Sequence, residues 1–468
     1  MIRDEIWTMS FLPVLADQRV VLHFLEDRSA WMEFCSNIVR GRVDKTLHLM
    51  NNIQELQDPQ SELLLLRSCA GVSRLYFALR TTFPEALQVA GSRFDDHLMQ
   101  YLRRLVVGDG AGFGLIQQRL ATLPIKDGGF GVLTMQDTMK YCYLASQAQT
   151  QHLQNSILKL PATTELSQGF QHAIQGFTQA CGLSLSDFNI NDAAPHFMKS
   201  LAVIYFGVVK EKVPSCFSLS TRESTIWKCN REEHAMDFLK AIPIPGINQV
   251  VGPRQFSFVL QYRLGIPLFE KDSKCACCGK HMDIFGDHAI HCASEVGLKF
   301  RHDMAKYVLA DICYKAGIVD RKEVSLGLIS AYNKELRPAD IMVYNWENSR
   351  DVCMDVTGVS PFTSARTRNF IPGSAISAAI TRKNNKYLDK CTSLGYGFGV
   401  LTFTTFGELS PDLTSFLKRL RNCMARHDAN FKIGNSLFHR LGIVIQKGVG
   451  AQLVARLPAF PCNTDFDS

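Results

Sequence analysis

The stretch CACCGKHMDIFGDHAIHC, residues 275–292, contains four cysteines and three histidines within eighteen residues. Cys275 and Cys278 are separated by two residues, and His288 and Cys292 by three. A CxxC turn lets two thiolates reach one ion, and the His–x3–Cys spacing puts the other two ligands one helical turn apart. Four such ligands, with no obvious opening for water, are typical of structural zinc. The sequence therefore predicts a zinc site that stabilises a segment with too few apolar residues to fold alone.

Three further residues of this stretch leave the ligand assignment open, namely Cys277, His281 and His291. Each could replace one of the four ligands. The alternative to a metal site is a cysteine-rich loop with buried thiols, which the specific spacing disfavours. Because a closed tetrahedral zinc site is structural, catalytic chemistry is expected elsewhere in the chain.

Two aspartates downstream could bind a second kind of metal. Asp340 heads the apolar run ADIMVYNW, and Asp355 lies inside DVCMDVTGV, with the polar turn ENSR between the runs. Adjacent strands of a hairpin can bring two carboxylates to a common edge, where their oxygens bind a divalent cation. In a nuclease such an ion activates water and offsets charge on the scissile phosphate. The alternative for each aspartate alone is a strand-end or turn carboxylate.

A lysine beside these carboxylates could orient water or stabilise developing charge. The predicted helix SAISAAITRKNNKYLDK places Ile376, Ile380, Lys383 and Tyr387 on one stripe, so Lys383 is expected to face the strands. A lysine among apolar neighbours needs a partner. Lys386 is the second candidate, and a solvated basic helix face is the alternative for both lysines.

The pair Asp95-Asp96 follows Phe94, as the metal-binding aspartates of a polymerase can. The apolar residues that follow recur at helical spacing instead of flanking a hairpin. We therefore predict that these aspartates lie in the first turn of a helix and face its positive end.

The order of the motifs resembles the C-terminal part of plant non-LTR retrotransposon-type reverse transcriptase proteins. The motifs, in chain order, are the zinc stretch, RHD at 301–303, RPAD ending at Asp340, MDVTGVSP containing Asp355, and RKNNKY containing Lys383 and Tyr387. In that family a CCHC zinc knuckle precedes a restriction-like endonuclease of the PD-(D/E)xK fold. The segment 113–146 resembles the thumb and linker that follow the polymerase palm. The resemblance spans nearly the whole chain.

The resemblance implies that Asp340 and Asp355 bind Mg²⁺ or Mn²⁺. It also implies that Lys383, or else Lys386, is the catalytic lysine, displaced onto a helix. The chain departs from the family motif at Ala339, which separates the proline from the aspartate, and at Thr357, which stands where the simplest motif has its lysine.

Three more residues enter through the resemblance. Glu323 is a possible further acidic ligand. Arg301 and His302 resemble the basic-histidine motif between knuckle and nuclease, with a helix start packed against the knuckle as the alternative. The sequence has no palm with separated aspartates, so a separate palm-containing chain is an implied partner.

These residues require an α+β multidomain fold to position them. Residues 31–154 show helical periodicity, with a glycine-rich loop at 108–135, whereas 155–270 are weakly patterned. A helix is expected near 298–316, and strands over the two aspartate-bearing runs and over GYGFGVLTFTT. The predicted division is a helical thumb-like region (1–154), a mixed linker region (155–270), a zinc knuckle (271–297), a restriction-like endonuclease core (298–408) and a basic helical extension (409–468).

Composition limits the setting of this chemistry. A chain of 468 residues is long enough for several cores, and its formal charge of +7 permits an acidic or nucleic-acid partner. Fifteen cysteines, mostly scattered singly, do not form a disulfide framework, which indicates a reducing nuclear or cytoplasmic compartment. The longest apolar run, at 201–209, is too short to span a bilayer, so no membrane partner is expected.

The leading hypothesis is a Mg²⁺-dependent endonuclease that nicks DNA, with DNA or RNA as partner. A non-catalytic nucleic-acid-binding remnant is the alternative, and a structural zinc scaffold is a third possibility. Basic side chains are candidates for phosphate contacts, which would make binding salt-sensitive. They are Arg366, Arg368, Arg382, Lys418, Arg419, Arg421 and Arg426.

Overall fold

The computed structural model describes residues 28–159, 168–184, 196–294, 297–329, 333, 335–347, 349–362, 370–427 and 436–457. The chain divides into two compact units, which are described separately. The first comprises Met1–Glu55, Leu65–Tyr101 and Leu133–Glu211, and the second comprises Leu56–Leu64, Leu102–Val132 and Lys212–Ser468. The predicted α+β class is confirmed, because helices accompany one mixed four-stranded sheet. The five predicted domain boundaries stay a prediction.

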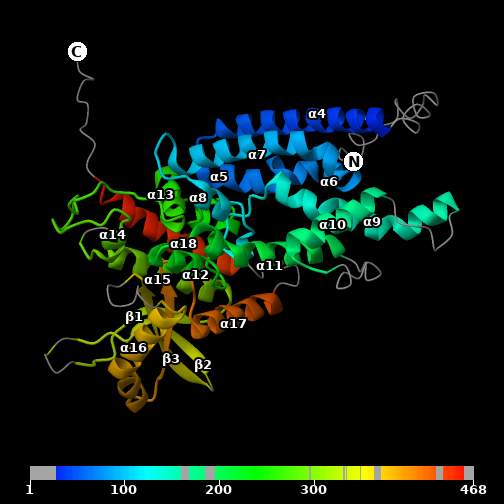
Figure 1. Ribbon diagram of the computed structural model, residues 1–468. Helices are drawn as coiled ribbons and strands as arrows, with labels where there is room; N and C mark the ends of the chain where they lie inside the picture. The colour runs from blue at the N-terminus through cyan, green and yellow to red at the C-terminus, as the bar shows by residue number, and fades with distance from the viewer. Residues whose placement is uncertain are drawn as a thin grey trace. The chain divides into compact units, whose positions relative to one another are not determined.

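The first unit is helical in its described part (Figure 1). Its helices are α4 (Arg28–Gln54), α6 (Tyr76–Thr81), α7 (Pro84–Val107), α9 (Met135–Leu158), α10 (Gln168–Cys181) and α11 (Phe197–Phe217), of which α7 and α11 end within the ranges of the second unit. Short π and 3-10 turns, Leu66–Ala70 and Val72–Leu75, precede α6. Helix α9 packs against α6 and α10.

Asp95 lies in the middle of α7, so the prediction of a first-turn position is wrong, although the helical prediction is confirmed. Its carboxylate accepts hydrogen bonds from the backbone N–H groups of Met135 and Gln136, at 2.6 and 2.9 Å. These are the first amides of α9, which have no acceptor within their own helix. Asp95 therefore faces the positive end of α9 and not that of its own helix. Helix α7 begins at Pro84, earlier than the apolar pattern suggested.

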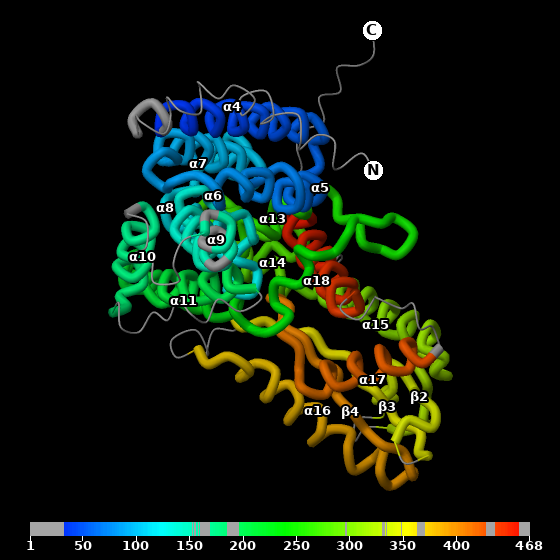
Figure 2. Tube along the Cα trace, turned by 90° about the vertical axis from the view of Figure 1, so that its right-hand side faces the viewer, coloured from blue at the N-terminus to red at the C-terminus, as the bar shows by residue number. Residues whose placement is uncertain are grey.

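The second unit contains the remaining helices and the sheet (Figures 1 and 2). The helices are α5 (Pro59–Leu65), α8 (Leu115–Ala121), α12 (Thr221–Asn230), α13 (Pro253–Arg263), α14 (Asp287–His291), α15 (Leu298–Lys315), α16 (Ser374–Ser393), α17 (Pro411–His427) and α18 (Ser436–Val454). Short 3-10 turns occur at Ile125–Asp127, Asp237–Lys240 and Pro245–Ile247. Helix α8 lies inside the predicted loop 108–135, so the loop prediction is wrong for these residues. The side chain of Gln117, the third residue of α8, accepts a hydrogen bond from the Gly114 N–H and closes the first turn of the helix.

The sheet consists of β1 (Asp320–Val324), β2 (Ala339–Glu347), β3 (Arg350–Val359) and β4 (Gly397–Thr404), in that order. The pairs β1–β2 and β2–β3 are antiparallel, whereas β3 and β4 are parallel and are connected through α16. The predicted β2–β3 hairpin, α16 and β4 are all present. Strand β1 was not predicted, since its residues DRKEV lack an apolar pattern.

One face of the sheet packs against α16. Met342 and Cys353 form a buried cluster there with Tyr387 and Cys391 of the helix. Because side chains alternate along a strand, Asp340 and Asp355 share this face with Met342 and Cys353. The fold thus brings both acids to the helix that carries Lys383.

Helix α18 forms the centre of the helical part of this unit. It packs against α13, α15 and the turn Asp237–Lys240, and almost all of its side chains are buried. Of the two described helices in the predicted basic extension, α17 carries the exposed basic residues, while α18 belongs to the core. Its small residues allow this close packing, since the backbone of α13 lies against Gly450.

Candidate functional site

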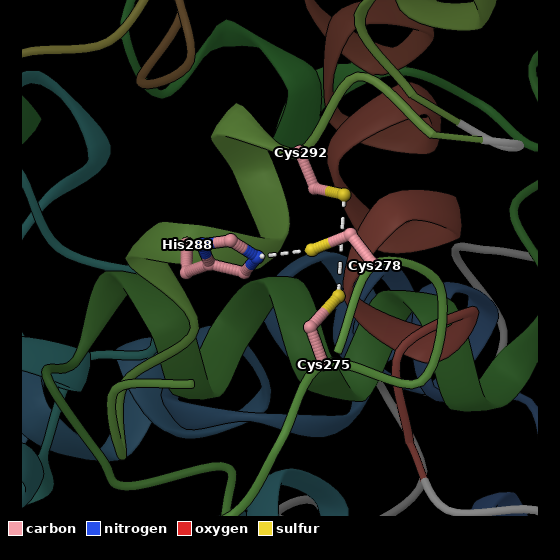
Figure 3. A group of neighbouring side chains, drawn as sticks. All are labelled: Cys275, Cys278, His288 and Cys292. Carbon is pink, nitrogen blue, oxygen red and sulfur yellow. Dashed lines mark hydrogen bonds between the residues drawn. The ribbon is translucent and has the colours of Figure 1, made fainter. Parts of the chain in front are cut away.

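The four predicted zinc ligands converge in the structure (Figure 3). The sulfur atoms of Cys275, Cys278 and Cys292 and a ring nitrogen of His288 all lie within 4.8 Å of one another. The Cys275 and Cys292 sulfurs are 3.9 Å apart, and the Cys278 sulfur lies 3.2 Å from His288 Nε2. These separations suit a tetrahedral ion, because two thiolates at ~2.3 Å from zinc lie roughly 3.8 Å apart.

Local hydrogen bonds position the ligands. The Cys275 N–H donates to Lys280 O and the Gly279 N–H to Cys275 O, both at 2.8 Å, which closes the CxxC turn. On the other side, the Asp283 carboxylate accepts from the N–H groups of Asp287 and His288 at the start of α14. These hydrogen bonds hold the turn and the short helix in the conformation that brings the ligands together.

The other candidates from the stretch lie outside this cluster. The Cys277 sulfur points to Ala455 O at 3.8 Å, and His281 lies on the surface, 3.9 Å from Asp272. His291 Nδ1 contacts Asp287 O at 2.7 Å. The geometry thus selects Cys275, Cys278, His288 and Cys292, and the donor set fits zinc.

The zinc stretch is anchored to its surroundings by a half-buried ion pair. Arg222 of α12 pairs with Asp287 of α14, and the Tyr262 hydroxyl donates to the same carboxylate at 2.9 Å. The guanidinium also lies over the rings of Phe285 and Phe362, 4.2 and 4.3 Å from their centroids. The sequence pattern did not indicate Arg222, because nothing in its neighbourhood marks a partner 65 residues away.

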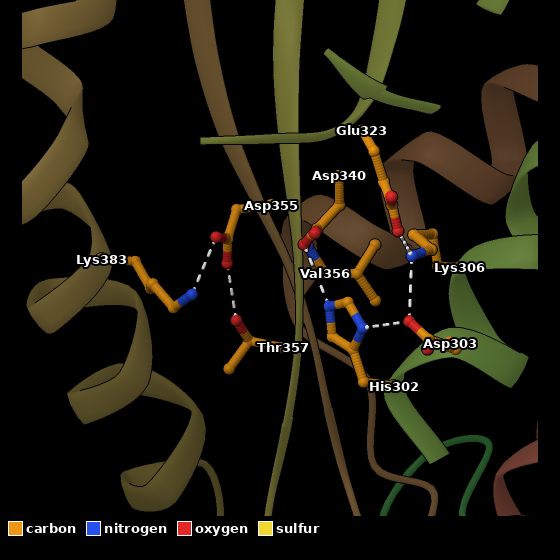
Figure 4. Close-up of polar contacts among 9 residues, drawn as sticks. All are labelled: His302, Asp303, Lys306, Glu323, Asp340, Asp355, Val356, Thr357 and Lys383. Atoms are coloured by element: carbon orange, nitrogen blue, oxygen red, sulfur yellow. Dashed lines mark hydrogen bonds and ion pairs between the residues drawn. The ribbon is translucent and has the colours of Figure 1, made fainter. Parts of the chain in front are cut away.

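Asp355 and Lys383 form an ion pair on the sheet face (Figure 4). The Lys383 Nζ donates to Asp355 Oδ1 at 2.8 Å, and the Thr357 hydroxyl donates to Oδ2 at 2.7 Å. Burial raises the pKa of Asp355, and nearby Asp340 adds to the rise, while Lys383 and Thr357 oppose it. The lysine thus has the partner that its place on the apolar stripe requires.

Asp340 is held by a second set of contacts. Its Oδ2 accepts from the Val356 N–H at 2.8 Å and lies 3.1 Å from His302 Nε2. The β2–β3 register that pairs Ile341 with Met354 places Asp340 opposite Asp355 when it is continued by one residue. Burial lowers the pKa of His302, but the contact with Asp340 raises this pKa by more than burial lowers it. The pKa of His302 therefore lies above the ordinary value.

A polar chain continues from His302 away from the two acids (Figure 4). Asp303 Oδ1 lies 3.2 Å from His302 Nδ1 and accepts from Lys306 Nζ at 2.9 Å. Lys306, whose side chain is 1% exposed, also pairs with Glu323. Glu323 therefore neutralises a buried lysine and is not among the residues that line the cavity containing Asp340.

An open cavity of about 410 Å³ contains both aspartates and Lys383. Two acids and several cations line it, the cations being Lys299, Arg301, His302, Arg337, Arg382 and Lys383. Arg301 is buried and donates to Gln452 Oε1 at 2.6 Å, so it belongs to the core below the cavity. Lys299, Arg337 and Arg382 are exposed at the rim. No motif indicated Lys299 or Lys306, and Arg337, the first residue of RPAD, was not predicted to line a cavity.

The remaining candidates fall elsewhere. Lys386 is exposed and lies over the Tyr387 ring, 4.7 Å from its centroid, outside the residues that line the cavity. Arg366 and Arg368 lie outside the described residues. On α17, Lys418, Arg419 and Arg426 are exposed and Arg421 is half-buried. Arg419 covers the ring of Trp346 at 3.8 Å and is thus engaged within the fold.

Comparison with protein-family models finds no match for this chain, and comparison with curated proteins finds none either. In the part of the chain that the structure describes, no helix is both long and apolar enough to cross a membrane. The two sites are therefore the basis on which a function can be proposed.

Proposed function

We propose that this chain is a metal-dependent endonuclease that nicks DNA, with a structural zinc beside the nuclease domain. The observation that carries the proposal is the convergence of Asp340, Asp355 and Lys383 in one open cavity with a basic rim. Two carboxylates and a lysine on a strand hairpin and a neighbouring helix can hold a divalent cation and stabilise the charge that develops when a phosphodiester is hydrolysed.

The chain's own residues have distinct parts in this proposal. Asp340 and Asp355 would hold Mg²⁺ or Mn²⁺, which supplies an activated water and offsets charge on the scissile phosphate. Lys383, at 2.8 Å from Asp355, is placed to orient that water or to stabilise the phosphate oxygens. His302 and the Val356 N–H keep Asp340 in position, and Thr357 does the same for Asp355.

The basic rim supports a polyanionic substrate. Lys299 lies at the start of α15 and Arg382 on α16, so exposed cations stand on two elements around the acid pair. Cations that neutralise backbone phosphates provide affinity without reading sequence. The same arrangement supports the resemblance to the knuckle and restriction-like endonuclease of plant non-LTR retrotransposon-type proteins, with a separate palm-containing chain as partner.

A nicking assay with the full chain tests the proposal. Supercoiled plasmid is incubated with Mg²⁺, Mn²⁺ or EDTA, and open circles are quantified. The parent is expected to nick with either metal, and Asp355→Asn to reduce the rate by at least about 100-fold. Asp389→Asn, an exposed carboxyl on the same helix as Lys383, is the matched control and is expected to leave the rate unchanged.

A second candidate function is non-catalytic binding of nucleic acid. Both oxygens of Asp355 and one oxygen of Asp340 already have protein partners, which a metal would have to share or displace. If the parent binds plasmid but nicks with neither metal, this candidate replaces the endonuclease. Equal nicking by the parent and Asp355→Asn would exclude the proposed site.

A further inference from the structure

A histidine between α12 and the 3-10 turn Asp237–Lys240 has one ring nitrogen held by a carboxylate. His234 Nδ1 lies 2.7 Å from Asp237 Oδ2, and Lys240 Nζ donates to Asp237 Oδ1 at 2.6 Å. Burial raises the pKa of Asp237, but the hydrogen bonds from His234 and Lys240 outweigh burial and lower this pKa to about 2. An ionised carboxylate can only accept, so Nδ1 carries a proton and the neutral ring has its lone pair on Nε2.

The second ring nitrogen lies beside another carboxylate. His234 Nε2 is buried and makes no hydrogen bond, although Glu233 Oε1 lies 3.4 Å away. This separation is long for a hydrogen bond. It suits two ligands of one tetrahedral ion, because a nitrogen and an oxygen at ~2.0–2.1 Å from zinc lie roughly 3.3 Å apart.

The imidazole is fixed before any ligand arrives. It stacks on the Phe438 ring of α18, with centroids 4.0 Å apart and planes inclined by 11°. The backbone of His234 has a φ of 67°, in the left-handed region that non-glycine residues adopt infrequently and that recurs at functional sites. Metal-binding histidines usually donate their other ring N–H to a carboxylate, as His234 does to Asp237.

The His234 ring borders a cavity of about 520 Å³ that lies within the second unit. His439, which follows Phe438 on α18, lines the same cavity, and burial lowers the pKa of its ring. A lowered pKa favours the neutral imidazole that a metal ion requires. The charged side chains of the lining balance one another and so do not repel a cation by net charge. The cations are Lys126, Arg231 and Lys240, and the acids are Glu232, Glu233 and Asp237.

We propose that His234 Nε2 and a Glu233 carboxylate oxygen bind a first-row transition-metal ion such as zinc, with His439 as a third ligand after rotation of its side chain. Imidazole and carboxylate ligands suit zinc, and water would complete the coordination. Among the described residues, three or more ligand groups converge within 4.8 Å only at the Cys3His cluster. The ion at His234 is therefore expected to bind more weakly than zinc at that cluster and to exchange with solution.

This site is separate from the proposed nuclease site. Neither His234 nor Glu233 lines the cavity that contains Asp340 and Asp355. The inference therefore does not depend on the proposed function, and its test does not use nicking as a readout.

The test counts zinc on the full chain by equilibrium dialysis and atomic emission. After dialysis against metal-free buffer the chain should keep about one zinc, and excess zinc should add about one more. His234→Asn should lose the added ion, because asparagine tolerates a left-handed backbone but lacks the ring nitrogen. Glu233→Gln should weaken binding of the added ion by at least about tenfold, since loss of a direct ligand costs no less than loss of an outer-shell partner. His439→Ala should also weaken it.

His172→Ala is the matched control, because His172 lies 3.9 Å from Glu85 and both side chains are about half exposed. It is expected to leave uptake of zinc unchanged. Glu233 is 78% exposed, so Glu233→Gln keeps the test decisive if thermal denaturation shows that His234→Asn does not fold. Failure of the parent to take up a second ion, or equal uptake by the parent and both variants, would overturn the site. His234 would then be an imidazolium shared between two carboxylates.

Discussion

At the scale of single residues, the carboxylate site depends on one ammonium group. The Asp355 side chain is 3% exposed, and that of Lys383 is 24% exposed. Such an acid needs its partner both for stability and for any use of the pair in chemistry. Lys386, three residues further along α16, is exposed and provides a direct comparison.

We expect Lys383→Met to lower the free energy of unfolding by ~1–3 kcal/mol, because it leaves Asp355 without its cation. The nicking rate should fall by at least about 100-fold. Lys386→Met should change stability by less than ~0.5 kcal/mol and leave nicking intact. Urea denaturation and the plasmid assay measure both quantities. If the lysine acts through Asp355, Lys383→Met should destabilise the Asp355→Asn background much less than the parent.

Asp95 gives a prediction for pH dependence in the first unit. Burial raises the pKa of Asp95 to about 6, although the amides of Gln136 and Met135 oppose the rise. Between pH 4 and 6 the folded state then binds more protons than the unfolded state, so stability falls as pH rises through this window. The Asp95→Asn side chain stays neutral at every pH. Its free energy of unfolding should therefore decrease by about 2 kcal/mol less than that of the parent between pH 4 and pH 7. Urea denaturation at pH 4 and 7 measures it.

The control for this prediction is Asp96→Asn, which removes an exposed carboxyl from the same helix. Because the Asp96 charge is the smallest of the causes that raise the pKa of Asp95, this change should lower that pKa only slightly and keep most of the parent's pH profile. Identical profiles for the parent and Asp95→Asn would show that Asp95 keeps an ordinary pKa.

At the scale of elements, the close packing of α18 on its neighbours supports the floor of the cavity. Arg301 and Gln452, joined by a hydrogen bond, connect α15 to α18. A methyl group at Gly448 would lie 2.8 Å from Arg301 Cγ, and one at Gly450 would lie 2.8 Å from Gln255 O of α13. The two glycines therefore set how closely α15 and α13 approach α18.

Gly450→Ala should destabilise the protein by ~1–3 kcal/mol, because the backbone of Gln255 must move to make room. This loss exceeds the ~1 kcal/mol that alanine gains over glycine inside a helix. Gly207→Ala in α11 is the matched control, since no atom lies within 4 Å of the added methyl group. It should leave stability unchanged or raise it by up to ~1 kcal/mol. Equal effects of the two changes in thermal denaturation would contradict the packing argument.

At the scale of the whole molecule, the chain combines a Cys3His cluster that could bind a metal ion with a separate pair of carboxylates that we propose bind a divalent cation. The thiolates and imidazole of the first suit zinc, and the carboxylates of the second suit magnesium or manganese. The Cys3His cluster lies in a loop-rich stretch between α13 and α15, whereas the two carboxylates face an open cavity.

Removal of zinc should therefore reduce stability. We expect about one zinc per chain by atomic emission, and a fall in Tm of at least about 5 °C after chelation, since binding energy at a structural zinc is folding energy. Cys278→Ser should lose the zinc and show the same fall. Cys277→Ser, the neighbouring thiol outside the ligand cluster, should retain both zinc and Tm. Equal zinc content in the two variants would contradict the ligand assignment.

The sequence alone determined those features that depend on a few neighbouring residues. The spacing of Cys275, Cys278, His288 and Cys292 indicated the ligand set, and the apolar alternation around Asp340 and Asp355 indicated the hairpin. Periodicity also placed Lys383 toward the strands. Each of these signals arises within one or two turns or strands, where local geometry determines which side chains share a face.

Only the tertiary structure decided which distant groups meet. His302 reaches Asp340 across 38 residues, and Lys383 reaches Asp355 across 28. Asp95 caps a helix that begins 40 residues later, although its neighbours suggested the start of its own helix. Such contacts depend on how whole helices and strands pack against one another. The sequence pattern around either partner does not indicate that packing.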